Sequence, residues 1–327
     1  MEQLWWWIGF NAFVLAMLAV DLLVFHKEAH EVRAREAAAW SLVWIVLALA
    51  FGAGVYRFMG RDAGLEYFTG YLIEKALSVD NIFVFVLIFS SFRVPARYQH
   101  RVLFWGILGA LLMRGAMIGA GAYLIQQFHW IIYIFGAFLV FTGIRTSLHV
   151  EHDFDAESSR PIRLIRRLMP VTNAYHGQRF FVREQGHRRS RLMATPLFVV
   201  LALVETTDLI FAVDSIPAIF AVTQKPFIVY SSNVFAILGL RALYFLLAGV
   251  IHRFHYLKAG LSTVLVFVGL KMLAIDVYKM PIGISLGVIA LVLGVSVALS
   301  WFRPPTELTK VTDKHGAPEV RSTHGED

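Results

Sequence analysis

Cysteine is absent from this chain of 327 residues. Its absence excludes disulfides, thiolate metal sites and cysteine nucleophiles together. Charged residues are also scarce, because they make up 16% of the sequence, where a soluble domain has about a quarter. Hydrophobic residues make up 57%, which is more apolar surface than one soluble core can bury. The composition therefore indicates a membrane protein.

The apolar runs have the length of membrane spans, because a transmembrane helix needs about 20 apolar residues. The first run, from Leu4 to Phe25, has no basic residue before it and no cleavage pattern after it, so we expect it to be retained. We predict an all-α integral membrane protein with about nine transmembrane helices in one polytopic membrane domain, residues 1–303. The predicted spans are 4–25, 37–57, 68–92, 102–125, 130–149, 196–221, 227–251, 259–278 and 282–302.

Basic residues gather in alternate loops, and this asymmetry sets the orientation of a membrane protein. Loops 26–36 and 93–101 and the segment 150–195 are rich in lysine or arginine, and the loops between them are poorer. We therefore expect the N-terminus outside and the C-terminus in the cytoplasm. The net charge of +7 reflects this topology, so the expected partner is the lipid bilayer and no nucleic-acid partner is expected.

The basic cytoplasmic loop 150–195 has two local patterns. Residues 161–169 are basic and amphipathic, which favours a helix along the inner leaflet. Residues 179–186 alternate and end on Gly186, which indicates a small hairpin. A solvated basic connector is the alternative interpretation of the loop. The tail 304–327 is polar, and we predict a disordered cytoplasmic segment there.

An internal repeat relates spans three to five to spans six to eight. The segment 139–145 resembles 265–271, and 79–82 resembles 213–216. In each copy an acid precedes the aspartate of the shorter motif by six residues, and an arginine falls within the following span. Each unit has three crossings, so the second copy would be inverted relative to the first. Inverted repeats are typical of transporters that hold their substrate near the midplane.

Acidic side chains within the spans are the candidate functional residues, because each charge in a bilayer centre costs at least about 2.5–3.5 kcal/mol. Structural ion pairs are one explanation, but the acids outnumber the cations available to them. Surplus carboxylates in a low dielectric take up protons or bind a cation. The candidate metal ligands are Glu74, Asp80, Asn81, Glu205, Asp208 and Asp214. The candidate charge-balancing or coupling residues are Lys75, Arg114, Arg241 and Lys271.

The ligand type limits the choice of ion. Carboxylate and amide oxygens suit Mg²⁺, Ca²⁺ and Mn²⁺, whereas zinc and copper prefer imidazole or sulfur, and no histidine falls in the middle of a span. On a straight helix, a step of six residues separates Glu74 from Asp80 by about 120°. One site that uses every acid therefore needs a bend. Pro217 offers one, because proline cannot donate to the Val213 carbonyl.

Two segments resemble the signature sequences of the TerC family of integral membrane proteins, Glu74–Asn81 and Glu205–Phe220. The segments 133–143 and 233–244 extend the resemblance, which covers nearly the whole chain to about residue 302. It is strongest to the Alx branch of manganese exporters. The resemblance implies Mn²⁺ as the transported ion, export across a bacterial inner membrane, and a metal path lined by the acids of these two spans.

Several alternatives stay open at this point. The exporter could be proton-coupled, and without a Walker-type loop ATP is not expected to drive it. Another hard cation, Ca²⁺ or Mg²⁺, fits the same ligands. A scaffold that delivers Mn²⁺ to exported proteins would use loop 150–195 as a docking surface for export machinery. An aspartyl protease dyad of Asp80 and Asp214 lacks the Gly-x-Gly-Asp setting, so we do not expect an enzyme.

Overall fold

The computed structural model describes residues 2–20, 34–148, 162–163, 165, 167, 169–172, 174–185, 190–249, 254, 256–278 and 280–302. The tail 304–327 lies outside the described residues, so its disorder stays a prediction. Most of the segment 149–168 is outside them too. The residues described between 162 and 167 are helical, as expected for the predicted amphipathic helix.

The described chain is almost entirely helical, and each of the nine predicted spans falls on a helix. The seventh span is divided in two, α8 and α9. The helices are α1 (Glu2–Val20), α2 (Ala34–Phe58), α3 (Arg61–Ser91), α4 (Ala96–Gln127), α5 (Ile131–Leu148), α7 (Pro196–Phe220), α8 (Pro226–Leu238), α9 (Leu240–Leu247), α10 (Leu257–Leu273) and α11 (Ile282–Phe302).

Six spans of the described chain are long and apolar enough to cross a membrane by length and composition: α2, α4, α5, α7, the α8–α9 pair and α11. The three other spans fall short for separate reasons. Helix α3 has 31 residues but includes charged side chains within its length. Helix α10 has 17 residues, and the apolar stretch of α1 runs only from Trp5 to Ala19.

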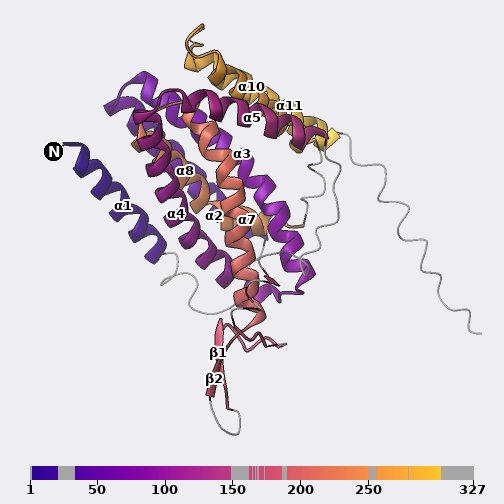
Figure 1. The fold of residues 1–327 in the computed structure, drawn as a ribbon. Coiled ribbons are helices and arrows are strands. Elements are labelled where there is room, and N and C mark those ends of the chain that lie inside the picture. The colour runs from indigo at the N-terminus through magenta and orange to yellow at the C-terminus, as the bar shows by residue number, and fades with distance from the viewer. Residues whose placement is uncertain are drawn as a thin grey trace, which may run out of the picture.

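Most helices form one bundle, and α5, α10 and α11 lie together at one end, oblique to the others (Figure 1). Buried side chains form three clusters. The first joins α3, α4, α5, α7, α8, α10 and α11; the second, rich in aromatic residues, joins α1, α2, α3, α4, α8 and α9; and the third joins the end of α3 to the first turns of α4 and α7 and to α9. Helices α3 and α4 contribute to all three, so they are the central elements of the bundle.

The predicted hairpin is confirmed, with β1 (Phe181–Gln185) antiparallel to β2 (Ser190–Ala194). The segment around it is docked on the end of the bundle, opposite α5, α10 and α11 (Figure 1). The Tyr175 hydroxyl donates to the Phe92 carbonyl at 2.8 Å, and the Arg101 guanidinium lies 5.3 Å from the centre of the Phe180 ring. The described part of loop 150–195 is therefore a folded cap, and the interpretation as a solvated connector does not hold for it.

The longer pair of matched motifs in the internal repeat lies on α5 and α10, and these two helices pack backbone to backbone. A methyl group built on Gly269 would lie 2.7 Å from the Gly136 carbonyl oxygen, and one on Gly143 would lie 2.9 Å from the Ser262 carbonyl oxygen. Small residues allow membrane helices to approach this closely. The contact places two matched segments together, but the inverted relation between the repeats stays a prediction.

We expect Gly269→Ala to destabilise the protein by about 1–3 kcal/mol, because α5 and α10 must separate to admit the methyl group. Gly287→Ala on α11 is the matched control, since a methyl group there meets no atom within 4 Å. The measurement is the unfolding midpoint in mixed detergent micelles. Equal midpoints for the two variants would show that the close approach is not required.

The structure corrects the prediction of a helix break at Pro217. Helix α7 continues through this proline to Phe220, because Pro217 lies in the last turn, where only a local loss of one hydrogen bond follows. Helix α3 is also continuous. The interruption falls instead at Gly239, between α8 and α9, where a methyl group would lie 2.8 Å from the Lys75 ammonium nitrogen.

Candidate functional site

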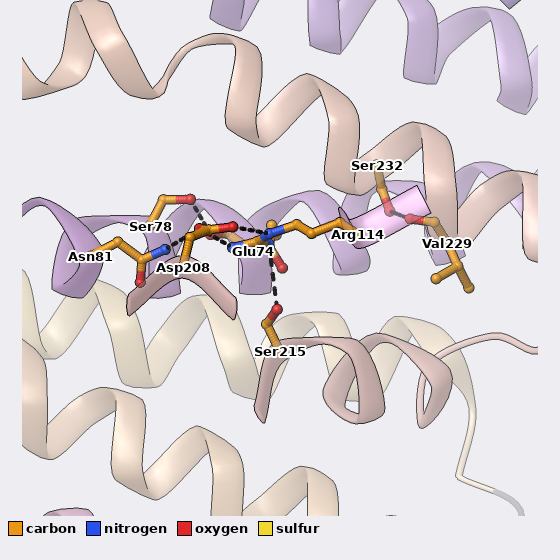
Figure 2. Close-up of polar contacts among 8 residues, drawn as sticks. All are labelled: Glu74, Ser78, Asn81, Arg114, Asp208, Ser215, Val229 and Ser232. Carbon is orange, nitrogen blue, oxygen red and sulfur yellow. Dashed lines mark hydrogen bonds and ion pairs between the residues drawn. The ribbon is translucent and has the colours of Figure 1, made fainter. Parts of the chain in front are cut away.

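Arg114 of α4 stands at the centre of a buried polar cluster between α3 and α7 (Figure 2). Its side chain is 2% exposed. Nε donates to Asp208 Oδ2 at 3.1 Å and Nη2 donates to Oδ1 at 2.8 Å, which is a bidentate pair. Nη1 donates to Glu74 and lies 3.4 Å from the Ser215 hydroxyl oxygen. One guanidinium therefore holds two carboxylates from different helices.

Helical spacing brings the other members of the cluster together. Glu74, Ser78 and Asn81 are four and three residues apart, so they share one face of α3. The Ser78 hydroxyl donates to the Glu74 carbonyl oxygen at 2.8 Å, and Asn81 Nδ2 donates to Asp208 Oδ1 at 3.4 Å. Asp208 and Ser215 are two turns apart on α7, so both face the same neighbour.

The cluster has more acceptor oxygens than donors among the described residues. Glu74 Oε2, Asn81 Oδ1 and Glu205 Oε2 are buried and accept no hydrogen bond there. The Glu205 carboxylate lies directly against Gly109 of α4 and interacts electrostatically with Asp208, one turn away. Buried polar atoms are almost always satisfied, so orphaned acceptors mark a place for water or a cation. Glu205 thus adds a third carboxyl group beside the pair that Arg114 holds.

The structure does not bring all six predicted ligands to one point. Asp214 is hydrogen-bonded to Thr142 and lies near Arg145, both on α5. Asp80 is half-buried on α3. Both aspartates are six residues from an acid of the cluster, a step that turns a straight helix by about 120° beyond full turns. No group of three or more His, Cys, Asp or Glu residues is arranged to hold a metal within the described part of the chain.

Of the predicted charge-balancing residues, Arg114 pairs with Glu74 and Asp208. Lys75 lies against Gly239, where its ammonium meets the carboxyl-terminal end of α8, the negative end of the helix dipole. Arg241 is buried at the start of α9. Lys271 interacts electrostatically with Glu66, and the nearby Asp276 accepts from Tyr133.

Glu66 is a buried acid that the sequence analysis did not single out. Its side chain is 11% exposed, and it accepts from the Thr223 hydroxyl at 2.8 Å and lies 3.1 Å from the Lys225 ammonium. Glu66 precedes Glu74 by eight residues, a step that turns a straight helix by about 80° beyond two full turns, so the two acids lie on adjoining parts of one side of α3. That spacing was the available signal, but the predicted third span began at residue 68.

Comparisons with known proteins identify relatives of this chain among integral membrane proteins. The family model described as the integral membrane protein TerC family matches residues 59–307. A membrane protein of Myxococcus xanthus is 55% identical over 96% of each chain. The candidate membrane-bound redox modulator Alx of Shigella flexneri is 51% identical over 86% of this chain and 90% of its own length. A membrane protein of Rickettsia bellii is 44% identical over 86% of this chain and 92% of its own length.

No solved structure gives a significant match to this chain. The family match covers more than half of the chain and includes every member of the Arg114 cluster. The identities extend over nearly the full length of the Alx proteins. The chain therefore belongs to the TerC family of multi-pass integral membrane proteins, in its Alx branch.

Proposed function

We propose that this protein exports a divalent metal ion, with Mn²⁺ as the main substrate, from the cytoplasm across a bacterial inner membrane. The N-terminus would lie outside and the C-terminus inside, as the loop charges predict. The observation that carries the proposal is the Arg114 cluster. A buried guanidinium holds Glu74 and Asp208 together, and unsatisfied carboxylate and amide oxygens surround it.

Arg114 acts in this proposal as an internal cation that the metal replaces. Removing one partner of a buried ion pair leaves an uncompensated charge, so the carboxylates need a cation at all times. With the site free of metal, Arg114 supplies that charge. When a divalent ion enters, the two carboxylates and the Asn81 oxygen can ligate it, and the guanidinium moves aside. The exchange keeps the buried charge balanced through the cycle.

The donor set supports a hard cation. Glu74, Asp208 and Glu205 offer carboxylate oxygens, and Asn81, Ser78 and Ser215 offer neutral ones, all of which suit Mn²⁺, Mg²⁺ or Ca²⁺. The resemblance to manganese exporters selects Mn²⁺ among them. Asp80 and Asp214 lie outside the cluster and would bind the ion before or after it occupies the cluster. The same acids could also carry protons, which would couple metal export to proton transport.

The name of the Alx relatives suggests a redox role. Thiol chemistry cannot support such a role in this chain, because the sequence has no cysteine. The scaffold alternative has one observation in its favour, the folded cap formed by the hairpin and Tyr175. Substituting exposed arginines of this cap, such as Arg183, separates the alternatives. An exporter keeps its flux after this change, whereas a scaffold loses delivery of the metal.

The test is metal flux in proteoliposomes that contain the purified protein and a trapped fluorescent indicator. We expect Mn²⁺ to enter or leave much faster than in empty liposomes, with Mg²⁺ and Ca²⁺ as the compared ions. Faster flux of Ca²⁺ or Mg²⁺ than of Mn²⁺ would identify that ion, and not Mn²⁺, as the main substrate. No flux of any of the three ions in folded protein would contradict the transport function.

A further inference from the structure

A polar stripe runs along α3 well beyond the Arg114 cluster. Its members are separated by four, four, four and three residues, so each lies about one turn from the next and the stripe follows α3 for four turns while it drifts by up to about 120° around the helix axis. The stripe consists of Glu66, Gly70, Glu74, Ser78 and Asn81. Apart from Gly70, each member has a polar side chain, and each is buried although the surrounding helices are apolar. The Arg114 cluster therefore occupies only half of this polar stripe.

Helix α8 lines the middle of this stripe with further polar groups. A methyl group on Gly70 would lie 2.8 Å from the Ser232 hydroxyl oxygen, so α8 packs directly on the gap between Glu66 and Glu74. The next residue, Asn233, is fully buried. Neither its amide oxygen nor its amide nitrogen has a hydrogen-bond partner among the described residues. Such a group is costly unless it is satisfied during function.

The stripe reaches the surface at Glu66. The Lys225 ammonium lies 3.1 Å from Glu66 Oε2 and 3.3 Å from Oε1, and the Thr223 hydroxyl donates to Oε2 at 2.8 Å. Lys225 is 53% exposed while Glu66 is 11% exposed. Both Thr223 and Lys225 belong to the short turn between α7 and α8. A tethered cation with access to the surface thus covers the last acid of the stripe.

We propose that Glu66 and Thr223 form a second divalent-cation site at the outer end of the metal path, which Lys225 closes by occupying Glu66 as a tethered cation. This inference rests on the proposed function and extends it from the Arg114 cluster to the exit. The two ends of the stripe then work alike, because an acid on α3 is held by a basic side chain until a divalent cation displaces it.

Because the chain has no cysteine, one introduced thiol can report access to the stripe. We would place it at Ser232, by Ser232→Cys, and add a membrane-impermeant thiol reagent to intact cells. We expect slow labelling in this variant and labelling about fivefold faster when Lys225→Gln is added, which is the size expected for loss of a half-exposed ion pair. Mn²⁺ in the medium should slow the labelling, and Glu66→Gln should remove this protection.

Two controls separate a gate from a structural ion pair. Ser296→Cys is also at a buried position but packs against Gly260 of α10, so Lys225→Gln should not change its labelling. Arg61→Gln removes an exposed charge at the same end of α3 and should leave the labelling of Ser232→Cys unchanged. Equal labelling rates of Ser232→Cys with and without Lys225→Gln would contradict the proposal that Lys225 closes the stripe. An acceleration by Arg61→Gln as large as that by Lys225→Gln would contradict it too.

The same samples distinguish failure of this inference from failure of the proposed function. If proteoliposomes move Mn²⁺ but Lys225→Gln changes neither labelling nor the Mn²⁺ concentration for half-maximal flux, the outer site is wrong and transport stands. If labelling accelerates and Mn²⁺ protects the thiol while no flux is measured, the outer cation site stands without transport. Acceleration without protection by Mn²⁺ would contradict the assignment of a divalent-cation site.

Discussion

Asp208→Asn is expected to reduce Mn²⁺ flux by about 100-fold, the effect of removing one partner from a buried charged pair. Asp208 accepts both arms of the Arg114 fork and the Asn81 amide, so it is the most connected carboxylate of the site. The amide side chain has nearly the same shape but no negative charge. A divalent ion would then lose one of its two closest charged ligands, and ligand charge is what sets the affinity of oxygen sites.

The measurement is initial flux in proteoliposomes over a range of Mn²⁺ concentrations. Asp62→Asn is the matched control, because Asp62 lies in the first turn of the same helix as Glu74 but is exposed. Glu74→Gln should behave like Asp208→Asn. Flux in Asp208→Asn at the level of Asp62→Asn, with intact folding, would exclude Asp208 as a ligand.

Arg114→Met is expected to destabilise the protein by about 3–5 kcal/mol, since it leaves Glu74 and Asp208 without their buried partner. Methionine retains the apolar bulk of the arginine stem, so the loss would come from charge and not from a cavity. Unfolding midpoints in mixed detergent micelles measure the effect. Arg57→Met, an exposed arginine in the last turn of α2, should change the midpoint little.

A double variant tests the cause of that instability. Arg114→Met combined with Asp208→Asn should regain much of the lost stability, because residues in one ion-pair network couple strongly. Mn²⁺ should also stabilise Arg114→Met more than it stabilises the parent, since the metal no longer competes with a guanidinium. A midpoint for Arg114→Met equal to that of Arg57→Met would contradict the central position of the guanidinium.

The long apolar runs made the helices predictable, because hydropathy alone determines a membrane span. The residues at which the helices begin and end were less predictable. Helix α3 begins at Arg61, seven residues before the predicted span, since charged and polar residues that lower hydropathy are buried against α7 and α8. For this reason Glu66 fell outside the predicted span and was missed. The hairpin was found because its alternation is local.

The candidate site was predictable as a set of residues but not as a geometry. The repeat motif identified Glu74, Arg114 and Asp208, which the structure brings into contact. The same motif includes Asp214, which faces α5 instead. A six-residue step on an unbroken helix explains this difference, as the sequence argument noted for Glu74 and Asp80. Which helix would be interrupted could not be read from Pro217, because the interruption depends on where Lys75 meets Gly239 in space.

The most direct test of the central claim is Mn²⁺ binding to the purified protein, measured as loss of the free-ion signal in electron paramagnetic resonance. Binding requires no coupling ion and no lipid gradient, and Glu66→Gln in every sample removes the proposed outer site, so the measurement isolates the Arg114 cluster. We expect the parent to bind Mn²⁺ and the double variant Glu74→Gln with Asp208→Asn to lose that binding while Asp62→Asn keeps it. Equal Mn²⁺ binding by the parent and the double variant would contradict the site and the mechanism built on it.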